Sequence, residues 1–189
     1  MSTQQAVLVG RSVAVLATDG VEEVEYTQSR AALERAGARV ELISIKSDPI
    51  QSVEHDINPS RTYDVDRTVM QADPARYVGL VLPGGTVNPD RLRMNRDAMQ
   101  FVRAFFAAEK PVAAICHGPV SLVEAGVLPG RTVTSYPSLR TDIGNAGATW
   151  VDRAVQVDGT LVTSRRPADL PEFCAALVRE FAEPQPVAS

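Results

Sequence analysis

Two short, almost wholly apolar runs constrain the fold of this chain more than any other feature. Residues 77–82 and 111–115 contain only hydrophobic side chains, one glycine and one proline, and both runs stop at a turn. A strand of this kind is apolar on both faces, so the fold must cover both faces, as it does in a parallel sheet. The chain is therefore expected to build an α/β fold around buried central strands.

Strand and helix patterns alternate along most of the chain. Further strand patterns lie at residues 12–17, 39–45, 132–134, 154–157 and 161–163, and helical patterns lie at residues 22–36, 98–106, 118–125 and 170–181. This alternation predicts a mostly parallel sheet with helices on both faces. We expect one domain over residues 1–189, with its core at about 12–182 and a flexible tail at 183–189.

Local signals set several element boundaries. Gly37 and Gly126 are expected to end two of the helices, and Asp169 is expected to cap the last one. Asp158 and Gly159 form the expected turn between the two late strands. Cys174 falls beside the apolar face of the last helix, so packing is its expected role.

Residues 46–76 do not follow the alternation. They are polar, rich in Asp and Pro, and show no sustained helical period. Such a segment is typical of a hairpin or an excursion from the sheet, and residues 63–70 are the strand that we expect within it.

Composition excludes several classes of protein. With a formal net charge of −4 and no block of Lys or Arg, the chain has no basic footprint for nucleic acid or an anionic membrane. No apolar stretch approaches the roughly 20 residues that span a bilayer, and the N-terminus lacks a signal-peptide pattern, so we expect a cytoplasmic protein. The two cysteines have no clustered partners for a disulfide framework or a zinc site, which predicts reduced thiols and no metal.

Three unusual turns follow predicted strands. The first is the acidic run from Asp19 to Glu25, the second is Gly84-Gly85, and the third is Cys116-His117. Because the carboxyl ends of parallel strands meet at one edge of a sheet, a carboxylate, backbone N–H donors and a thiol are expected to converge there. Taken singly each turn has a simpler explanation, since acidic residues in a first helical turn usually complement the helix dipole.

Cys116 is the candidate nucleophile. A buried strand delivers it into a tight turn that continues as His117 and a Gly-Pro pair. Strand-to-helix turns of this kind expose a nucleophile beside backbone N–H groups that lower a thiol pKa and hold an oxyanion. The alternative for a lone cysteine in an apolar run is an inert, buried side chain.

Four motifs together carry a family resemblance. Residues 82–85 read Leu-Pro-Gly-Gly, and the others lie at 114–119, 134–137 and 164–170. With these motifs the chain resembles the ThiJ/PfpI superfamily, and more narrowly its PfpI-type intracellular protease branch, from about residue 12 to 182. The resemblance implies a flavodoxin-like three-layer α/β sandwich with a mostly parallel central sheet, related to class I glutamine amidotransferase domains. Members of this superfamily have peptidase, glyoxalase, deglycase, chaperone and oxidant-response roles.

The resemblance also implies roles for particular residues. Cys116 matches the elbow nucleophile, and Glu25 matches the carboxyl group that hydrogen-bonds the cysteine and moves protons, with Glu22 as the second choice. The N–H groups of Gly85 and His117 match the oxyanion hole. Gly84, Glu22 and Tyr136 are the expected pocket residues, although a core or interface position fits Tyr136 equally well.

Self-association follows from the same resemblance. In the PfpI branch an acidic residue after the Gly-Gly loop comes from a neighbouring subunit and orients the histidine beside the nucleophile. Asp90 is the nearest match, and it is one methylene shorter than the glutamate usual in the branch. The resemblance thus implies dimers or hexamers, with a cross-subunit triad of Cys116, His117 and Asp90.

Three functions are expected, in this order. The first is a stress-response enzyme in which Cys116 attacks a reactive carbonyl, either a small dicarbonyl or a glycated protein, without metal, cofactor or glutathione. The second is a cysteine peptidase in which His117 acts as general base. The third is a non-enzymatic oxidant sensor or chaperone whose Cys116 is oxidised to sulfinic acid.

Overall fold

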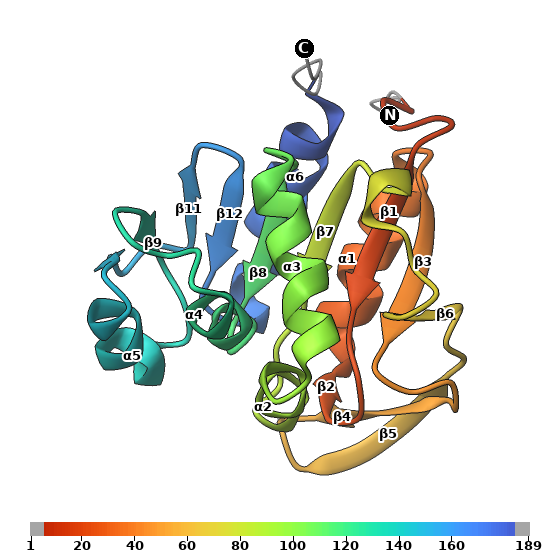
Figure 1. The fold of residues 1–189 in the computed structure, drawn as a ribbon, viewed down its shortest axis with the longest axis horizontal. Helices are drawn as coiled ribbons and strands as arrows, with labels where there is room; N and C mark the ends of the chain where they lie inside the picture. The colour runs from red at the N-terminus through yellow and green to blue at the C-terminus, as the bar shows by residue number, and fades with distance from the viewer. Residues whose placement is uncertain (1–5, 184–189) are drawn as a thin grey trace.

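A seven-stranded sheet forms the centre of the molecule (Figure 1), and the computed structural model describes residues 6–183. The strand order is β11-β12-β8-β7-β1-β3-β6, and every neighbouring pair is parallel except β11 with β12. The strands are β1 (Ser12–Leu16), β3 (Arg39–Ser44), β6 (Arg67–Thr68), β7 (Gly79–Leu82), β8 (Val112–Ile115), β11 (Val155–Asp158) and β12 (Leu161–Ser164). The expected mostly parallel sheet is confirmed.

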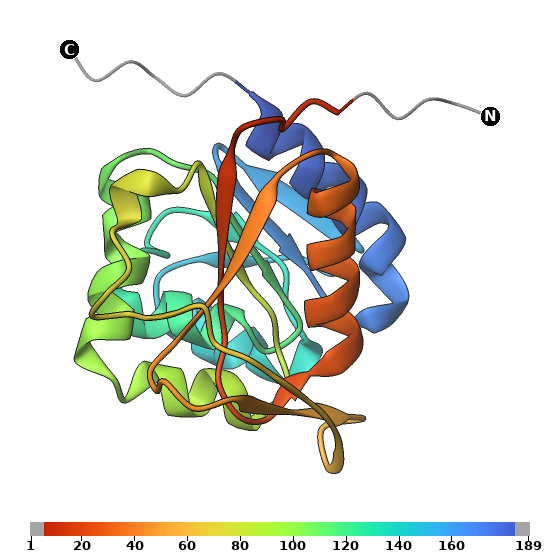
Figure 2. The same cartoon turned by 90° about the vertical axis from the view of Figure 1, so that its right-hand side faces the viewer.

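Helices cover both faces of this sheet, as Figure 2 shows. One face carries α1 (Glu23–Arg35) and α6 (Leu170–Ala182), and the other carries α3 (Arg96–Ala107) and α4 (Pro119–Ala125), with α2 (Val87–Arg93) beside them. Alternate residues of β1 point into the two layers: Val13 and Val15 join the α1/α6 core, whereas Ala14 and Leu16 join the α3/α4 core. The three-layer α/β sandwich is therefore confirmed.

Most helix ends lie where the sequence places them. Gly37 and Gly126 adopt positive φ angles of 93° and 70° just after α1 and α4. Asp169 does occupy the N-cap position of α6, but its carboxylate makes no cap and accepts hydrogen bonds from Arg165 Nε at 2.9 Å and Arg165 Nη2 at 3.1 Å. The prediction that Asp169 caps this helix through its side chain was wrong, because the nearby guanidinium binds both carboxylate oxygens.

The polar segment at 46–76 contains the expected hairpin. Strands β4 (Ile50–Glu54) and β5 (Asn58–Tyr63) pair antiparallel, and β2 (Val21–Glu22) adds a third strand to this small sheet. The strand expected at 63–70 was mostly wrong, since only Arg67–Thr68 pairs with the edge of β3. Polar edge strands of this length leave little periodicity in the sequence.

Short elements without periodicity were missed altogether. They are α2, α5 (Arg140–Asn145), β10 (Thr149–Trp150) and the 3₁₀ turns η1 (Pro74–Arg76), η2 (Pro137–Leu139) and η3 (Pro167–Asp169). The strand expected near 132 is β9 (Thr132–Val133), but it pairs with β10 in a separate two-stranded sheet. The three 3₁₀ turns each begin with a proline, and the Asp73 side chain caps η1, so local signals other than periodicity mark them.

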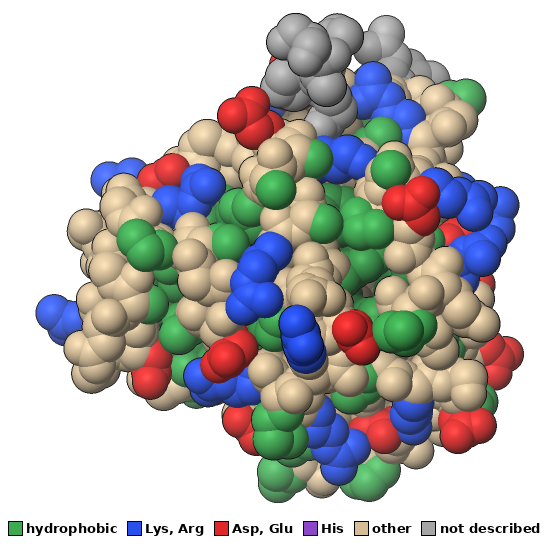
Figure 3. Space-filling view, viewed as in Figure 1, with side chains coloured by type: hydrophobic (Ala, Val, Ile, Leu, Met, Phe, Trp, Pro, Cys, Tyr) green, Lys and Arg blue, Asp and Glu red, His purple; other side chains and the backbone are tan. Residues whose placement is uncertain are grey.

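The remaining expectations concern surface and cysteines. Basic and acidic side chains are interspersed over the face shown in Figure 3. Cys116 and Cys174 are both free thiols, and Cys174 packs half-buried against the α1/α6 core, as expected. Within residues 6–183 no helix is long and apolar enough to cross a membrane. Most of the expected flexible tail, residues 184–189, lies outside the described residues.

The close approach of α6 to the central sheet gives a stability prediction. A β-carbon built at Gly79 would lie 2.5 Å from Phe181 Cε2, and Phe181 is fully buried. Gly79→Ala is therefore expected to lower the free energy of unfolding by about 1–3 kcal/mol, because the ring must leave its packed position.

Urea unfolding of Gly79→Ala measures this effect, and Gly144→Ala is the matched control. Gly144 lies in α5 with open space around it, so alanine there is expected to be neutral or to stabilise by up to about 1 kcal/mol. Equal stability of Gly79→Ala and the wild type would contradict this account of the packing.

Candidate active site

Cys116 occupies a sharp turn between β8 and α4. Its φ angle is 61°, a left-handed conformation that few cysteines adopt, and its side chain is only 5% exposed. Two backbone hydrogen bonds hold the turn: Cys116 N donates to Ser164 O at 3.0 Å, and Tyr136 N donates to Cys116 O at 2.9 Å. The strand end, the positive φ and the following helix make the nucleophile-elbow geometry that the sequence predicts.

Glu25 lies beside this elbow on the first turn of α1. It is fully buried, and its Oε2 accepts a hydrogen bond from Gly84 N at 2.7 Å. Its Oε1 is buried with no hydrogen-bond partner among residues 6–183. A β-carbon built at Gly84 would lie 2.8 Å from both Cys116 Cβ and Glu25 Oε2, so only glycine lets the thiol and the carboxyl approach across this loop.

The two expected oxyanion donors lie at the same place. A β-carbon at Gly84 would also lie 2.9 Å from His117 N, so the glycine keeps that amide accessible. Gly85 has a φ of 79°, and a β-carbon there would overlap the carbonyl oxygen of Gly20. The structure thus brings Gly84, Gly85, His117, Glu25 and Cys116 together, as convergence of the strand ends requires.

His117 is held on both sides of its ring. Its Nδ1 lies 3.3 Å from Cys116 Sγ, and its Nε2 lies 3.4 Å from Ser138 Oγ. The ring of Tyr136 stacks on it with centroids 4.6 Å apart and an interplanar angle of 24°. Burial lowers the pKa of His117 below its usual 6.5, so the imidazole is mainly neutral at physiological pH.

The thiol and the carboxyl influence each other's protonation. Burial raises the pKa of Glu25 from its usual 4.5 to about 8, and the charges of Glu22 and Asp56 add to this effect. Burial also raises the pKa of the Cys116 thiol, and the charge of Glu25 raises it further. The expectation that this turn lowers the thiol pKa was therefore wrong, because the His117 amide opposes these two effects without overcoming them. Two adjacent buried anions are unfavourable, so the pair retains a proton near neutral pH.

A small cavity opens above the thiol. Its volume is about 210 Å³, and it is lined by Glu22, Glu25, His55, Asp56, Cys116, Tyr136 and Pro167. The structure therefore places the expected pocket residues Glu22 and Tyr136 at this cavity, and Tyr136 is partly exposed there rather than packed in a core. Gly84, the third expected pocket residue, is buried and does not line it.

Glu22 fastens the tip of the β4–β5 hairpin over this cavity. Its Oε1 accepts a hydrogen bond from His55 N at 3.0 Å and its Oε2 accepts one from Asp56 N at 3.0 Å. Asp56 Oδ1 in turn accepts one from Thr86 N at 2.9 Å, next to the Gly-Gly loop. The Glu22 carboxylate thus binds backbone groups of the hairpin, beyond any effect on the helix dipole.

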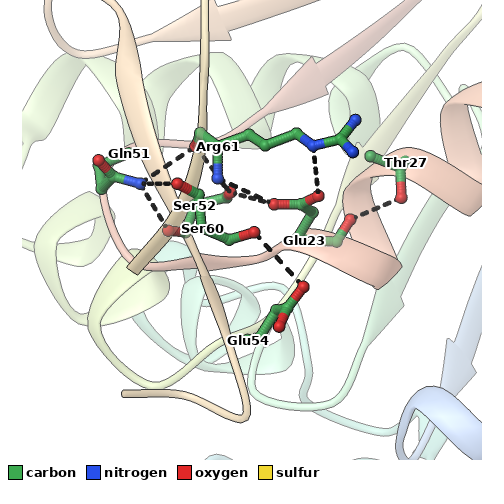
Figure 4. A network of polar contacts seen from close by, with 7 residues as sticks. All are labelled: Glu23, Thr27, Gln51, Ser52, Glu54, Ser60 and Arg61. Carbon is green, nitrogen blue, oxygen red and sulfur yellow. Dashed lines mark hydrogen bonds and ion pairs between the residues drawn. The ribbon is translucent and has the colours of Figure 1, made fainter. Parts of the chain in front are cut away.

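Glu23 fastens the base of the same hairpin to α1 (Figure 4). Its Oε2 accepts hydrogen bonds from Ser52 Oγ at 2.7 Å and Arg61 N at 3.1 Å, and Arg61 Nε lies 3.8 Å from Oε1. The hydroxyls of Ser60 and Ser52 and the Arg61 amide lower the pKa of Glu23 to about 2. Glu23 is therefore a structural anion that holds one wall of the cavity in place.

Comparison with known proteins decides the family. The model of the DJ-1/PfpI family matches residues 11–180. This chain belongs to the DJ-1/PfpI family.

Several members of the DJ-1/PfpI family are close to this chain. It is 41% identical over 171 residues to a deglycase of Pyrococcus abyssi, covering 90% of this chain and 97% of that protein. It is 37% identical over 165 residues to the Bacillus subtilis protein named "Putative cysteine protease YraA", covering 87% of this chain and 95% of that protein. The crystal structure of Drosophila melanogaster DJ-1beta superposes with a TM-score of 0.82 at 28% identity, covering 91% of this chain and 90% of that one.

Within a single chain, Asp90 lies away from the other candidate catalytic residues. It is exposed on α2 and lines a separate groove of about 600 Å³ with residues that include Arg91, Val120 and Val123. Among residues 6–183, the Asp90 carboxylate makes no hydrogen bond or ion pair. A triad with His117 would need Asp90 from a second subunit, and it stays a prediction.

Four residues near the thiol were missed from the sequence: His55, Asp56, Ser138 and Pro167. His55 and Asp56 have φ angles of 55° and 67° at the hairpin tip. Histidine and aspartate tolerate this left-handed conformation better than most residues, so a His-Asp pair between two short strands was the available turn signal. Ser138 lies in the turn η2 and carries no comparable signal, whereas Pro167 lies within the motif at 164–170 but was not singled out as a pocket residue.

The raised pKa of Glu25 predicts how stability depends on pH. The folded protein holds a proton that the unfolded chain releases above about pH 4.5, so wild-type stability falls as pH rises toward about 8. Glu25→Gln keeps the carbonyl acceptor for Gly84 N and cannot ionise. Its free energy of unfolding relative to wild type is expected to rise across this window, by up to about 1.4 kcal/mol per pH unit.

Urea titrations between pH 5 and pH 8 measure that difference. Glu34→Gln removes the same charge from an exposed position of the same helix and controls for net charge. A Glu25→Gln curve that runs parallel to the wild-type curve over the whole window would show that this carboxyl titrates normally.

Proposed function

We propose that this chain is a cysteine-dependent enzyme that acts on reactive carbonyls, of the glutathione-independent glyoxalase or protein deglycase type. The observation that carries this proposal is the Cys116 elbow, which opens into a cavity of only about 210 Å³ beside the fully buried carboxyl of Glu25. A cavity of this size suits a small electrophile better than a peptide. The deglycase name of the Pyrococcus abyssi relative supports the same class.

The reactive state is the one in which Cys116 has released its proton to solvent while Glu25 keeps its own. The first step is addition of this thiolate to an aldehyde carbon. The Cys116 sulfur forms a bond to that carbon, the carbonyl electron pair moves to oxygen, and the product is a hemithioacetal. The N–H groups of Gly85 and His117 are the donors for the developing oxyanion. Glu25 holds a proton near neutral pH because burial raises its pKa to about 8, so it serves as the acid for this oxygen.

The following steps depend on the substrate. With methylglyoxal, the ionised Glu25 takes the hydrogen from the carbon bound to sulfur and returns it to the neighbouring carbon. The resulting thioester is hydrolysed by water to lactate and free thiolate. An early glycated amine has no free aldehyde, because that carbon already carries the amine and a hydroxyl group. Here the first step is instead a displacement: the sulfur–carbon bond forms, the carbon–nitrogen bond breaks, Glu25 supplies the proton that the departing amine needs, and the same hemithioacetal results.

A cysteine peptidase is the second candidate. Its supporting observation is the 3.3 Å approach of His117 Nδ1 to Cys116 Sγ, which is the pairing that a cysteine–histidine mechanism uses. The name of the Bacillus subtilis relative agrees with it. This candidate needs Asp90 from a second subunit to orient the imidazole, and a substrate that reaches the thiol from outside the small cavity.

Cys116→Ala is expected to abolish lactate formation from methylglyoxal, at least about a hundredfold. It is expected to remain folded, because alanine keeps the β-carbon and removes a single sulfur from the buried core. Lactate is measured enzymatically in parallel with cleavage of casein and of a short peptide. Cys174→Ala is the matched control, since it removes the other thiol on a different helix and is expected to retain full activity.

Each outcome assigns the protein to one class. Lactate that depends on Cys116, without proteolysis, supports the carbonyl enzyme. Peptide cleavage alone supports the second candidate and directs attention to His117, Asp90 and the subunit interface. No activity in either assay rejects both enzymes and favours an oxidant sensor, and full activity of Cys116→Ala rejects any role for this thiol in catalysis.

A further inference from the structure

The cavity above Cys116 is acidic. Three of its lining residues are carboxylic acids, Glu22, Glu25 and Asp56, and none is lysine or arginine. Glu25 Oε1 is fully buried with no partner among residues 6–183 although it belongs to this lining. The Cys116 thiol is the neighbour of this carboxyl, since a hydrogen bond between the two side chains contributes to both pKa values, so Glu25 and Cys116 form the inner end of the cavity.

A second cavity lies next to the first. It has a volume of about 470 Å³, shares Glu22 and His55 with the thiol cavity, and is further lined by Glu23, Val24, Thr27 and Glu54. The thiol cavity has the volume of only about seven liquid water molecules. A methylglyoxal fragment fits there, whereas the amine or thiol that carries it must extend beyond the thiol cavity, past its acidic lining. We call the two cavities together the acidic pocket.

The charges of the acidic pocket are not equally available. Both carboxylate oxygens of Glu22 accept hydrogen bonds from backbone N–H groups, and Glu23 accepts hydrogen bonds from Ser52 and Arg61. The Arg61 guanidinium and the positive end of the α1 dipole offset part of this negative charge.

Asp56 and Glu54 remain free to act on a ligand. Asp56 uses Oδ1 to accept from Thr86 N, and its Oδ2 has no hydrogen bond among the described residues. Glu54 is exposed and has one long contact, 3.4 Å from Ser60 Oγ. Asp56 lines the thiol cavity itself, so its charge faces a substrate that is bound at Cys116.

We infer that the acidic pocket selects carbonyl adducts whose carrier bears a positive charge, such as a guanidinium or ammonium group, and that Asp56 determines this specificity. The reaction part of the inference rests on the proposed function, but the charge preference does not. An ion pair with Asp56 at the rim of a partly buried cavity is worth roughly a tenfold preference for cations over anions.

A bound cation also favours the reactive state of the site. Burial is the largest cause of the raised pKa values of Cys116 and Glu25, and the charge of Asp56 raises both further. A positive carrier beside Asp56 cancels that contribution, so it shifts Cys116 toward the thiolate when the substrate is in place.

Chemical labelling of Cys116 tests the charge preference without any need for turnover. Three methanethiosulfonate reagents are used, with a trimethylammonium, a sulfonate or an uncharged methyl group, in a Cys174→Ala background with mass spectrometry as readout. Each rate is divided by the rate of the same reagent with a small free thiol. The normalised cation-to-anion ratio is expected to be roughly ten at low salt and to fall toward one at high salt.

Asp56→Asn identifies the residue responsible. Asparagine keeps the acceptor for Thr86 N and tolerates the left-handed φ of 67°, so the hairpin tip is retained. The normalised ratio is expected to fall several-fold in this variant. Glu109→Gln is the control, since it removes the same charge near the opposite end of β8 and is expected to leave the ratio unchanged.

Turnover then tests whether the preference reaches substrates. The probes are methylglyoxal hemithioacetals of thiocholine, 2-mercaptoethanol and 3-mercaptopropionate, which carry positive, neutral and negative groups, and kcat/KM is expected to fall in that order. A labelling ratio of one, or turnover indifferent to carrier charge, overturns the inference. A clear labelling preference with no turnover of any adduct rejects the proposed function instead and leaves the acidic pocket as a cation site.

Discussion

The hydrogen bond from Gly84 N to Glu25 Oε2 joins two parts of the chain 59 residues apart, at 2.7 Å and out of contact with water. It fastens the first turn of α1 to the loop after β7, and the absence of a side chain at Gly84 lets Cys116 lie against the same carboxyl. The cost of burying that carboxyl raises its pKa to about 8. The elbow, the amide donors and the proton needed for chemistry therefore depend on one contact.

The hairpin contributes the other half of the site. Glu22 and Glu23 are consecutive acids, yet they hold different parts of this hairpin: Glu22 holds the tip over the thiol, and Glu23 holds the base. The hairpin is itself an insertion in the sheet order rather than part of the main sheet. Its position lets a segment with little core of its own shape the cavity and bring Asp56 to the thiol.

Much of this arrangement could be predicted from the sequence. The runs ending at Leu82 and Ile115 are apolar on both faces, which only a covered parallel sheet satisfies, and parallel strands necessarily deliver Gly84, Gly85 and Cys116 to the same edge. The tip at His55 and Asp56 could not be predicted in the same way. Its place is set by carboxylate-to-amide bonds from Glu22, which leave no periodic trace in the sequence. The short helix that carries Asp90 is similarly defined by its contacts.

The central claim is that Glu25 controls the ionisation of Cys116. The most direct measurement is the rate of Cys116 alkylation by iodoacetamide as a function of pH, followed by mass spectrometry in the wild type and in Glu25→Gln. Because the charge of Glu25 raises the pKa of the thiol, the account predicts that the Glu25→Gln profile moves to lower pH. Identical profiles for the two proteins would contradict the coupling between carboxyl and thiol.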